Sequence, residues 1–272
     1  MRVVIYLLMT VDREADIPTV LYHRLIFRSD SPGNRTQAVV EGAQVVVRRS
    51  APLVLGAPLR GEGWLAAGGL SNTSYHRRGI VAIGGKARIP QRFATDWGRI
   101  GEDGKPFRGD RVHNANWYPY GAEVLAVADA VVADLKDGIP ENEPASRAVP
   151  ITLETVGGNY VILDLGKGNF AFYAHLQPKS IRVRLGQKVR RGQVLALLGN
   201  SGNSESPHLH FHVTNGNSPL GAEGVPYVFE SFELQGILPS IKELGNWKPP
   251  ATNKADKRRM ELPVENAVVR FP

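Results

Sequence analysis

The tripeptide His208-Leu209-His210 is the part of this sequence best equipped for chemistry. It stands in the run GNSGNSESPHLHFHV, residues 199–213, where glycines and a proline disfavour a helix and the closing FHV favours a strand. Two histidines at positions i and i+2 of an extended strand project from the same face. Neutral imidazoles held side by side can bind a metal ion and exchange protons next to it. The motif predicts such a site, against the plainer alternative of a polar row facing solvent.

The elements that must position these histidines are predicted to be β-strands. Short apolar runs between turns recur through residues 121–213, and the 272-residue chain holds 29 glycines and 19 prolines to form turns. In residues 183–199, Gly186 and Gly192 allow two tight turns to bracket a short strand, which resembles the turn–strand–turn of barrel-sandwich folds. The expected fold class is therefore mainly β.

Three segments are expected along the chain. Residues 1–60 form a small N-terminal β region, residues 61–236 form the main domain, and residues 237–272 form a C-terminal tail. The stretch 98–121 lacks a repeating apolar face and is interpreted as an insertion within the main domain. The last segment of the tail, ELPVENAVVRFP, is expected to return as an edge strand.

The N-terminal region is expected to be a small β-sandwich or part of one. Strands are predicted in residues 21–30 and 43–55, with a turn at SPGN, residues 31–34. The opening MRVVIYLLMT is interpreted as a first strand or as the start of a truncated gene, because charged residues interrupt the apolar run before it reaches the length of a signal-peptide core. Both export and its absence stay open.

Composition limits the partners and the possible metal ligands. The net charge of +7 suits polyanions, namely nucleic acid, anionic lipid or the acidic polymers of a bacterial envelope. Specific nucleic-acid binding is not expected, because no recognition-helix or base-stacking motif is present. No apolar run approaches the roughly 18–20 residues of a transmembrane helix. The chain has no cysteine, so histidines and carboxylates must hold any metal.

Three further motifs join the HLH tripeptide in a family resemblance. They are RFATDW at residues 92–97, FYAHL at residues 172–176, and the long block that begins VRLGQKVRRGQVLALLG at residue 183. In this order, over about residues 85–213, the chain resembles the lysostaphin-type (LytM-like) zinc metallopeptidases, or murein endopeptidases. The resemblance implies an antiparallel-sheet peptidase domain with a groove floored by the sheet.

The same resemblance implies a function. It is that of a zinc metalloendopeptidase hydrolysing peptide cross-links of bacterial cell-wall peptidoglycan, in the cell envelope or secreted. The alternative is a catalytically inactive module of the same fold that binds cell wall or a partner enzyme. A third hypothesis, a lipoyl- or biotinyl-type carrier domain, explains residues 183–199 but leaves the histidines without a role. The oligomeric state is not predicted.

Site residues follow from the resemblance by position. The family holds zinc through the histidine and aspartate of a His-x-x-x-Asp motif and through the second histidine of His-x-His. Asp96 and His210 would then be metal ligands, and His175 and His208 the catalytic pair. Zinc with three protein ligands leaves a fourth position for water. His212 shares a face with His210 and is expected to be structural or exposed, with a supporting role behind His210 as the alternative.

The sequence departs from the family pattern at Arg92, which stands where the first histidine belongs. Arginine stays protonated and cannot bind zinc. One hypothesis is that another histidine replaces it; His76 is preferred and His113 is the other candidate. A second is that Asp96 and His210 alone bind zinc weakly. A third is that the site is inert, with Arg92 paired to Asp96.

Overall fold

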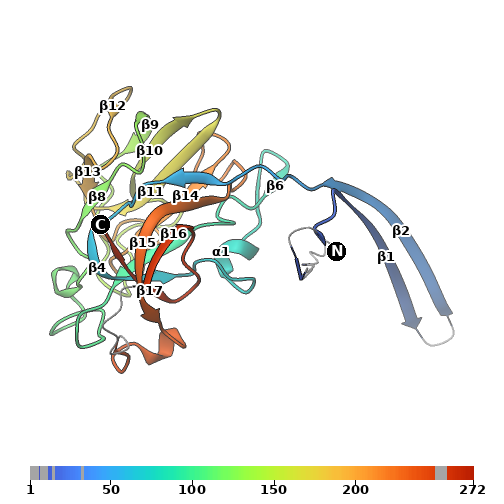
Figure 1. Cartoon of the computed structure of the whole chain (residues 1–272), viewed down its shortest axis with the longest axis horizontal. Helices are drawn as coiled ribbons and strands as arrows, with labels where there is room; N and C mark the ends of the chain where they lie inside the picture. Colours follow the sequence, from blue (N-terminus) through green and yellow to red (C-terminus); the bar gives the residue numbers. More distant parts are fainter. Residues whose placement is uncertain (1–5, 7–11, 14–15, 32–33, 249–255) are drawn as a thin grey trace. The chain divides into compact units, whose positions relative to one another are not determined.

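The computed structural model describes residues 6, 12–13, 16–31, 34–248 and 256–272, and divides into two compact units, Met1–Ala51 and Pro52–Pro272. The fold is mainly β, as predicted (Figure 1). Apart from Tyr6, the strand predicted in MRVVIYLLMT lies outside the described residues. Within the described part of the chain, no helix is long and apolar enough to cross a membrane.

The elements follow one another as strands with very little helix. They are β1 (Val20–Ser31), β2 (Asn34–Val46), β3 (Leu53–Leu55), β4 (Gly61–Ala67), α1 (Tyr75–Arg78), β5 (Val81–Ile83), β6 (Lys86–Arg88), β7 (Thr95–Arg99), the 3-10 turn η2 (Asn114–Asn116), β8 (Glu123–Leu125), β9 (Ala130–Lys136), β10 (Asn159–Gly166), β11 (Asn169–Leu176), β12 (Lys188–Val189), β13 (Val194–Leu197), β14 (Leu209–Thr214), β15 (Tyr227–Ile237), the 3-10 turn η3 (Ile241–Glu243), β16 (Asp256–Glu261) and β17 (Ala267–Phe271).

The first unit contains the antiparallel hairpin of β1 and β2. Its last backbone pair is Ser31 with Asn34, and the two residues between them in the predicted turn lie outside the described residues. The expectation of a sandwich is wrong for the described residues, which form a single two-stranded sheet here. Two strands alone cannot cover both of their faces, and Tyr22 and Val46 are accordingly exposed.

The second unit is built on one large sheet, in the order β12-β9-β10-β11-β14-β7-β4-β17-β15-β16, with the short β3 added in parallel to β15. Strand β17 lies between β4 and β15, inside the sheet rather than at its edge as expected. Val268, Val269 and Phe271 of this strand are all buried, in two clusters, so both of its faces are covered as in a central strand.

The glycine turns predicted in residues 183–199 are present. Gly186 and Gly192 have left-handed φ angles of 76° and 79°, and the two-residue strand β12 lies between them. The strand after the second turn, β13, pairs with β8.

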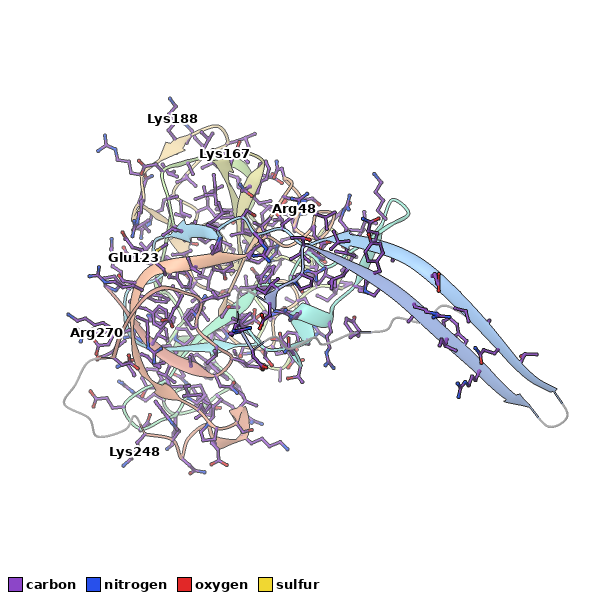
Figure 2. All side chains as sticks on the ribbon, turned by 45° about the vertical axis from the view of Figure 1, so that its right-hand side comes forward. Arg48, Glu123, Lys167, Lys188, Lys248 and Arg270 are labelled. Carbon is purple, nitrogen blue, oxygen red and sulfur yellow. The ribbon has the colours of Figure 1, made fainter. Side chains whose placement is uncertain are left out.

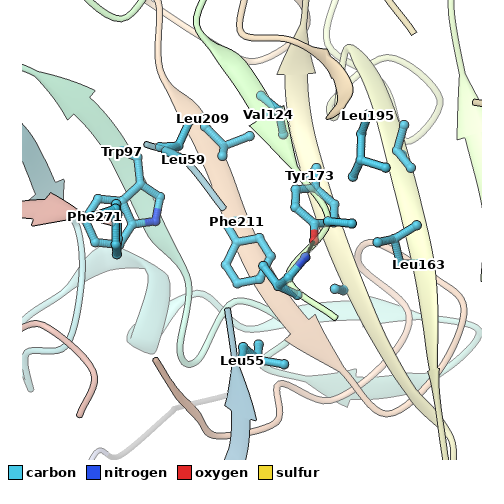
Figure 3. Close-up of a cluster of buried hydrophobic side chains, with 14 of the residues drawn as sticks. Leu55, Leu59, Trp97, Val124, Leu163, Tyr173, Leu195, Leu209, Phe211 and Phe271 are labelled. Carbon is cyan, nitrogen blue, oxygen red and sulfur yellow. Dashed lines mark hydrogen bonds between the residues drawn. The ribbon is translucent and has the colours of Figure 1, made fainter. Parts of the chain in front are cut away.

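The core of the second unit lies on one face of the central strands (Figure 3). Trp97 of β7 stacks edge-on against Phe271 of β17 at 5.1 Å, and Tyr173 of β11 against Phe211 of β14 at 5.0 Å. Because side chains alternate along a strand, burying Trp97 and Phe211 on this face puts their sequence neighbours on the other. Asp96 and His210 are such neighbours.

Basic side chains are scattered over the second unit. Lys167, Lys188, Lys248 and Arg270 point outward at widely separated places (Figure 2), and all four are exposed. These four side chains therefore do not share one face of the unit.

Candidate metal centre

Strand register brings Asp96 and His210 together. His210 of β14 pairs directly with Asp96 of β7 across the sheet, while Ala174 of β11 and Ala67 of β4 flank them in the same row. Opposed residues of antiparallel strands lie on the same face with their Cβ atoms roughly 5 Å apart. The His210 Nδ1 atom accordingly lies 2.8 Å from Asp96 Oδ1.

His76 reaches this pair from the end of β4. Gly68 follows β4 with a φ of +56°, which turns the chain into the loop that leads to α1. The Gly68 carbonyl accepts hydrogen bonds from Ser74 Oγ at 2.7 Å and from His76 Nδ1 at 2.8 Å. With its proton on Nδ1, His76 directs the lone pair of Nε2 toward Asp96 Oδ2, 3.5 Å away.

His76, Asp96 and His210 form a group whose candidate ligand atoms all lie within 4.8 Å of one another. Ligand atoms at tetrahedral angles around zinc are about 3.3 Å apart, given bonds of about 2.0–2.1 Å. Two imidazoles and one carboxylate, nearly buried on the open face of a sheet, therefore fit zinc with one position left over. His113 is exposed at the start of η2 and lies outside this group.

Burial sets the protonation of His76, and the neighbouring histidines set that of Asp96. It lowers the pKa of His76 to about 4, although Asp96 opposes the shift. Burial by itself would raise the pKa of Asp96, but the facing His208 and His76 and the hydrogen bond with His210 outweigh it and hold that pKa well below its usual range. At neutral pH a neutral His76 thus faces an ionised Asp96, the forms that bind a metal.

His175 and His208 stand beside the group. Their ring centroids are 4.8 Å apart, and His208 Nε2 is 3.6 Å from Asp96 Oδ1. Each ring has Nδ1 on a main-chain carbonyl, at 2.7 Å from Ser201 O for His175 and at 2.8 Å from Ser206 O for His208.

Two observations set His175 apart. It has a left-handed φ of 64°, a strained conformation that is typical of functional sites. Burial, reinforced by His208, lowers its pKa well below the ordinary value, so that its imidazole is neutral and able to accept a proton.

Arg92 does not contact Asp96, and the hypothesis of an ion pair between them is wrong. Its guanidinium donates to Glu223 Oε1 from Nη2 at 2.6 Å and from Nε at 3.1 Å. The pair ties the turn before β7 to the loop after β14. Arg92 therefore does not compete with a metal for the Asp96 carboxylate.

Of two further close contacts of the group, that of Tyr75 was not predicted, and that of His212 was predicted only as the alternative to a structural or exposed position. The Tyr75 hydroxyl donates to Asp96 Oδ2 at 2.6 Å, and burial and the nearby Asp96 raise the pKa of Tyr75, so it stays protonated. His212 is fully buried with Nδ1 only 2.8 Å from His210 Nε2. The i+2 spacing of His212 from His210 indicates in the sequence that the two rings are neighbours. For Tyr75, only its adjacency to His76 indicates a position near the group.

A cleft of about 720 Å³ opens onto the group. Its walls include His175, His208, Trp117, Phe172 and Arg147. The cleft thus combines the titratable side chains with apolar walls, as substrate-binding clefts do.

Comparison with protein families indicates the class of the domain. Residues 117–221 match the model of peptidase family M23, a range that includes His175, His208 and His210 and begins after His76 and Asp96. The match and the relatives below support an M23 domain in this chain.

Two curated proteins show how far the similarity extends. Peptidoglycan DD-endopeptidase ShyA of Vibrio cholerae is 42% identical over 145 residues, which cover 50% of this chain and 29% of ShyA. An uncharacterized metalloprotease of Haemophilus influenzae is 31% identical over 191 residues, covering 67% of this chain and 37% of that protein. The chain thus spans well under half the length of either relative.

Among solved structures, a mutant catalytic domain of the prophage-encoded M23 protein EnpA from Enterococcus faecalis is similar. It is 20% identical with a TM-score of 0.35, covering 65% of this chain and 93% of that one.

Proposed function

We propose that this protein is a zinc metalloendopeptidase that hydrolyses peptide cross-links of peptidoglycan, with Zn²⁺ held by His76, Asp96 and His210. The observation that carries the proposal is the position of His76, whose Nε2 faces Asp96 although it comes from a different segment than the family motif. It supplies the third ligand that Arg92 cannot. The names of the two Vibrio cholerae relatives, both peptidoglycan DD-endopeptidases, support the substrate class.

His175 and His208 supply proton transfer and oxyanion stabilisation in this proposal. When bound, zinc supplies a Lewis acid that lowers the pKa of water to about 7 and polarises the scissile carbonyl. Because both rings hold their Nδ1 proton on a backbone carbonyl, each offers Nε2 to the reacting groups. At Nε2, one ring accepts the proton of the attacking water and returns it to the leaving amine. The other ring, after taking up a proton from solvent at Nε2, donates a hydrogen bond to the developing oxyanion.

Three residues of the cleft wall, Trp117, Phe172 and Arg147, position the peptide, and Tyr75 positions Asp96. Trp117 and Phe172 offer apolar walls, and Arg147 keeps donors available while one of its Nη2 hydrogens bonds Asn203 Oδ1 at 3.0 Å. Tyr75 holds Oδ2 of Asp96 by its hydroxyl, which leaves Oδ1 directed toward His210.

The test is the zinc content of protein purified without chelator, together with the release of peptides from purified peptidoglycan. We expect one zinc per chain and hydrolysis for the wild type, and loss of both for His76→Ala and His210→Ala. His113→Ala is the matched control and keeps both. Binding of peptidoglycan without zinc, unaffected by His210→Ala, would instead support the inactive binding module.

A further inference from the structure

His212 is the one histidine near the cleft to which the proposed reaction gives no role. It lies on the same face of β14 as His210 and is 0% exposed. Its Nδ1 is 2.8 Å from His210 Nε2, and the two rings meet edge to face with centroids 5.0 Å apart. The Phe172 ring covers it from β11, also at 5.0 Å.

The histidines of the site differ in the hydrogen-bond partner of their Nδ1 atom. In His76, His175 and His208, Nδ1 faces a backbone carbonyl, which can only accept a hydrogen bond. The proton is therefore fixed on Nδ1, which leaves a lone pair on Nε2. His210 is turned the other way, because its Nδ1 faces Asp96 and its Nε2 faces His212.

This reversed orientation leaves the tautomer of His210 open. Asp96 Oδ1, 2.8 Å from Nδ1, favours a proton on Nδ1, and that proton would block a metal. A neutral imidazole has only one N–H, so the Nδ1 lone pair becomes available when the proton sits on Nε2. The acceptor within hydrogen-bond distance of that N–H is Nδ1 of His212, since the other polar side-chain atom nearby, Gln91 Nε2 at 3.4 Å, is a donor.

We propose that His212 is a positioning residue that selects the Nε2-protonated tautomer of His210 and so holds the Nδ1 lone pair toward the metal. Loading the site then moves the His210 proton from Nδ1 to Nε2, and the His212 proton to its own Nε2, with no net change in charge on the pair. His212 Nε2 is buried and has no hydrogen-bond partner among the described residues, so this shift has a cost that binding of the metal must offset. The inference rests on the proposed metal site.

Two substitutions at position 212 separate this role from simple packing. His212→Phe fills the same space without an acceptor, and we expect zinc affinity, measured by competition with a chelator, to fall 10- to 100-fold. His212→Asn can place an amide oxygen near the position of Nδ1, and its affinity should stay within about threefold of the wild type. Thermal unfolding of the metal-free variants reports any loss of packing separately.

A measurement on the wild type does not depend on how the variants fold. Nitrogen-15 spectra of labelled histidines in the zinc-loaded protein should show the His210 proton on Nε2, hydrogen-bonded to Nδ1 of His212. A His210 proton on Nδ1, or a folded His212→Phe protein that binds zinc as tightly as the wild type, would overturn the inference alone. A wild type that binds no zinc would overturn the metal site as well.

Discussion

Gly68 shows how closely a single residue controls the candidate site. A Cβ atom there would lie 2.6 Å from the Tyr75 hydroxyl and 3.0 Å from His76 Nδ1, both closer than ordinary contact. The residue is therefore needed for the space it leaves as well as for its left-handed backbone.

Gly68→Ala should displace His76 and weaken zinc binding at least tenfold. Gly84→Ala is a matched control, because Gly84 has nearly the same φ, +58°, with nothing within 4 Å of the new Cβ. Both variants carry a similar backbone strain of about 1–2 kcal/mol in the free energy of unfolding. If the two lose zinc affinity equally, strain and not displacement of His76 is responsible.

The buried histidines make the stability of the metal-free protein depend on pH. The folded pKa of His76 is about 4, below its ordinary value near 6.5. Between these two pH values the unfolded chain binds the proton and the folded chain does not, so the free energy of unfolding falls as pH falls. The slope is up to about 1.4 kcal/mol per pH unit for each such histidine.

His76→Gln removes one of these histidines. We expect its free energy of unfolding to fall less than that of the wild type between pH 7 and pH 5, measured by denaturant titration with a chelator present. His113→Gln, at an exposed position, should behave like the wild type. Parallel wild-type and His76→Gln curves would contradict the burial of a neutral His76.

At the scale of the element, the sheet aligns the site and the loops complete it. The register of β14 with β7 places His210 directly opposite Asp96. The turn before β7 and the loop after β14 are joined by Arg92 and Glu223 rather than by backbone pairing alone. The ion pair thus connects two loops and takes no part in the candidate metal group.

Arg92→Ala should cost about 1 kcal/mol of unfolding free energy, since the pair is only partly buried and its charges are partly solvated. Its zinc affinity should stay within about threefold of the wild type. A large gain in zinc affinity would mean that Arg92 competes for Asp96 in solution, contrary to its contact with Glu223.

At the scale of the whole molecule, the hydrophobic core belongs to one unit. The main buried cluster runs from Leu55 to Phe271, entirely within Pro52–Pro272. The hairpin of β1 and β2 adds none of its members. The last strand, in contrast, is central, because Phe271 packs on both Trp97 and Phe229.

Removing the first unit and removing the last strand should therefore have opposite effects on folding and zinc binding. A chain of residues 52–272 should fold and bind zinc as the full chain does. A chain ending at Leu262 lacks β17 and should fail to fold cooperatively, because β4 and β15 lose the strand between them. Circular dichroism during heating and zinc content decide both outcomes, and a stable chain without β17 would contradict the core described above.

Much of the architecture was accessible from the sequence, because it depends on local rules. Side chains alternate along a strand, so the sequence HLHFHV predicts histidines on one face. Glycine readily adopts positive φ angles, so Gly186 and Gly192 predict turns. The prediction of an N-terminal sandwich was wrong for the described residues, and the predicted edge position of the last strand was wrong, because the residues of a strand do not specify which strands pair with it.

The sequence by itself determined the mainly β class and the set of histidines and carboxylates from which a site could be drawn. The tertiary structure decided how they combine: that His76 rather than His113 lies beside Asp96, that Arg92 faces Glu223, and that His212 faces His210. The physical reason is the distance along the sequence over which each kind of interaction acts. Period and turn preference act over a few residues, whereas Arg92 and Glu223 are 131 residues apart, and only the packing of the sheet and its loops brings such groups within hydrogen-bond distance.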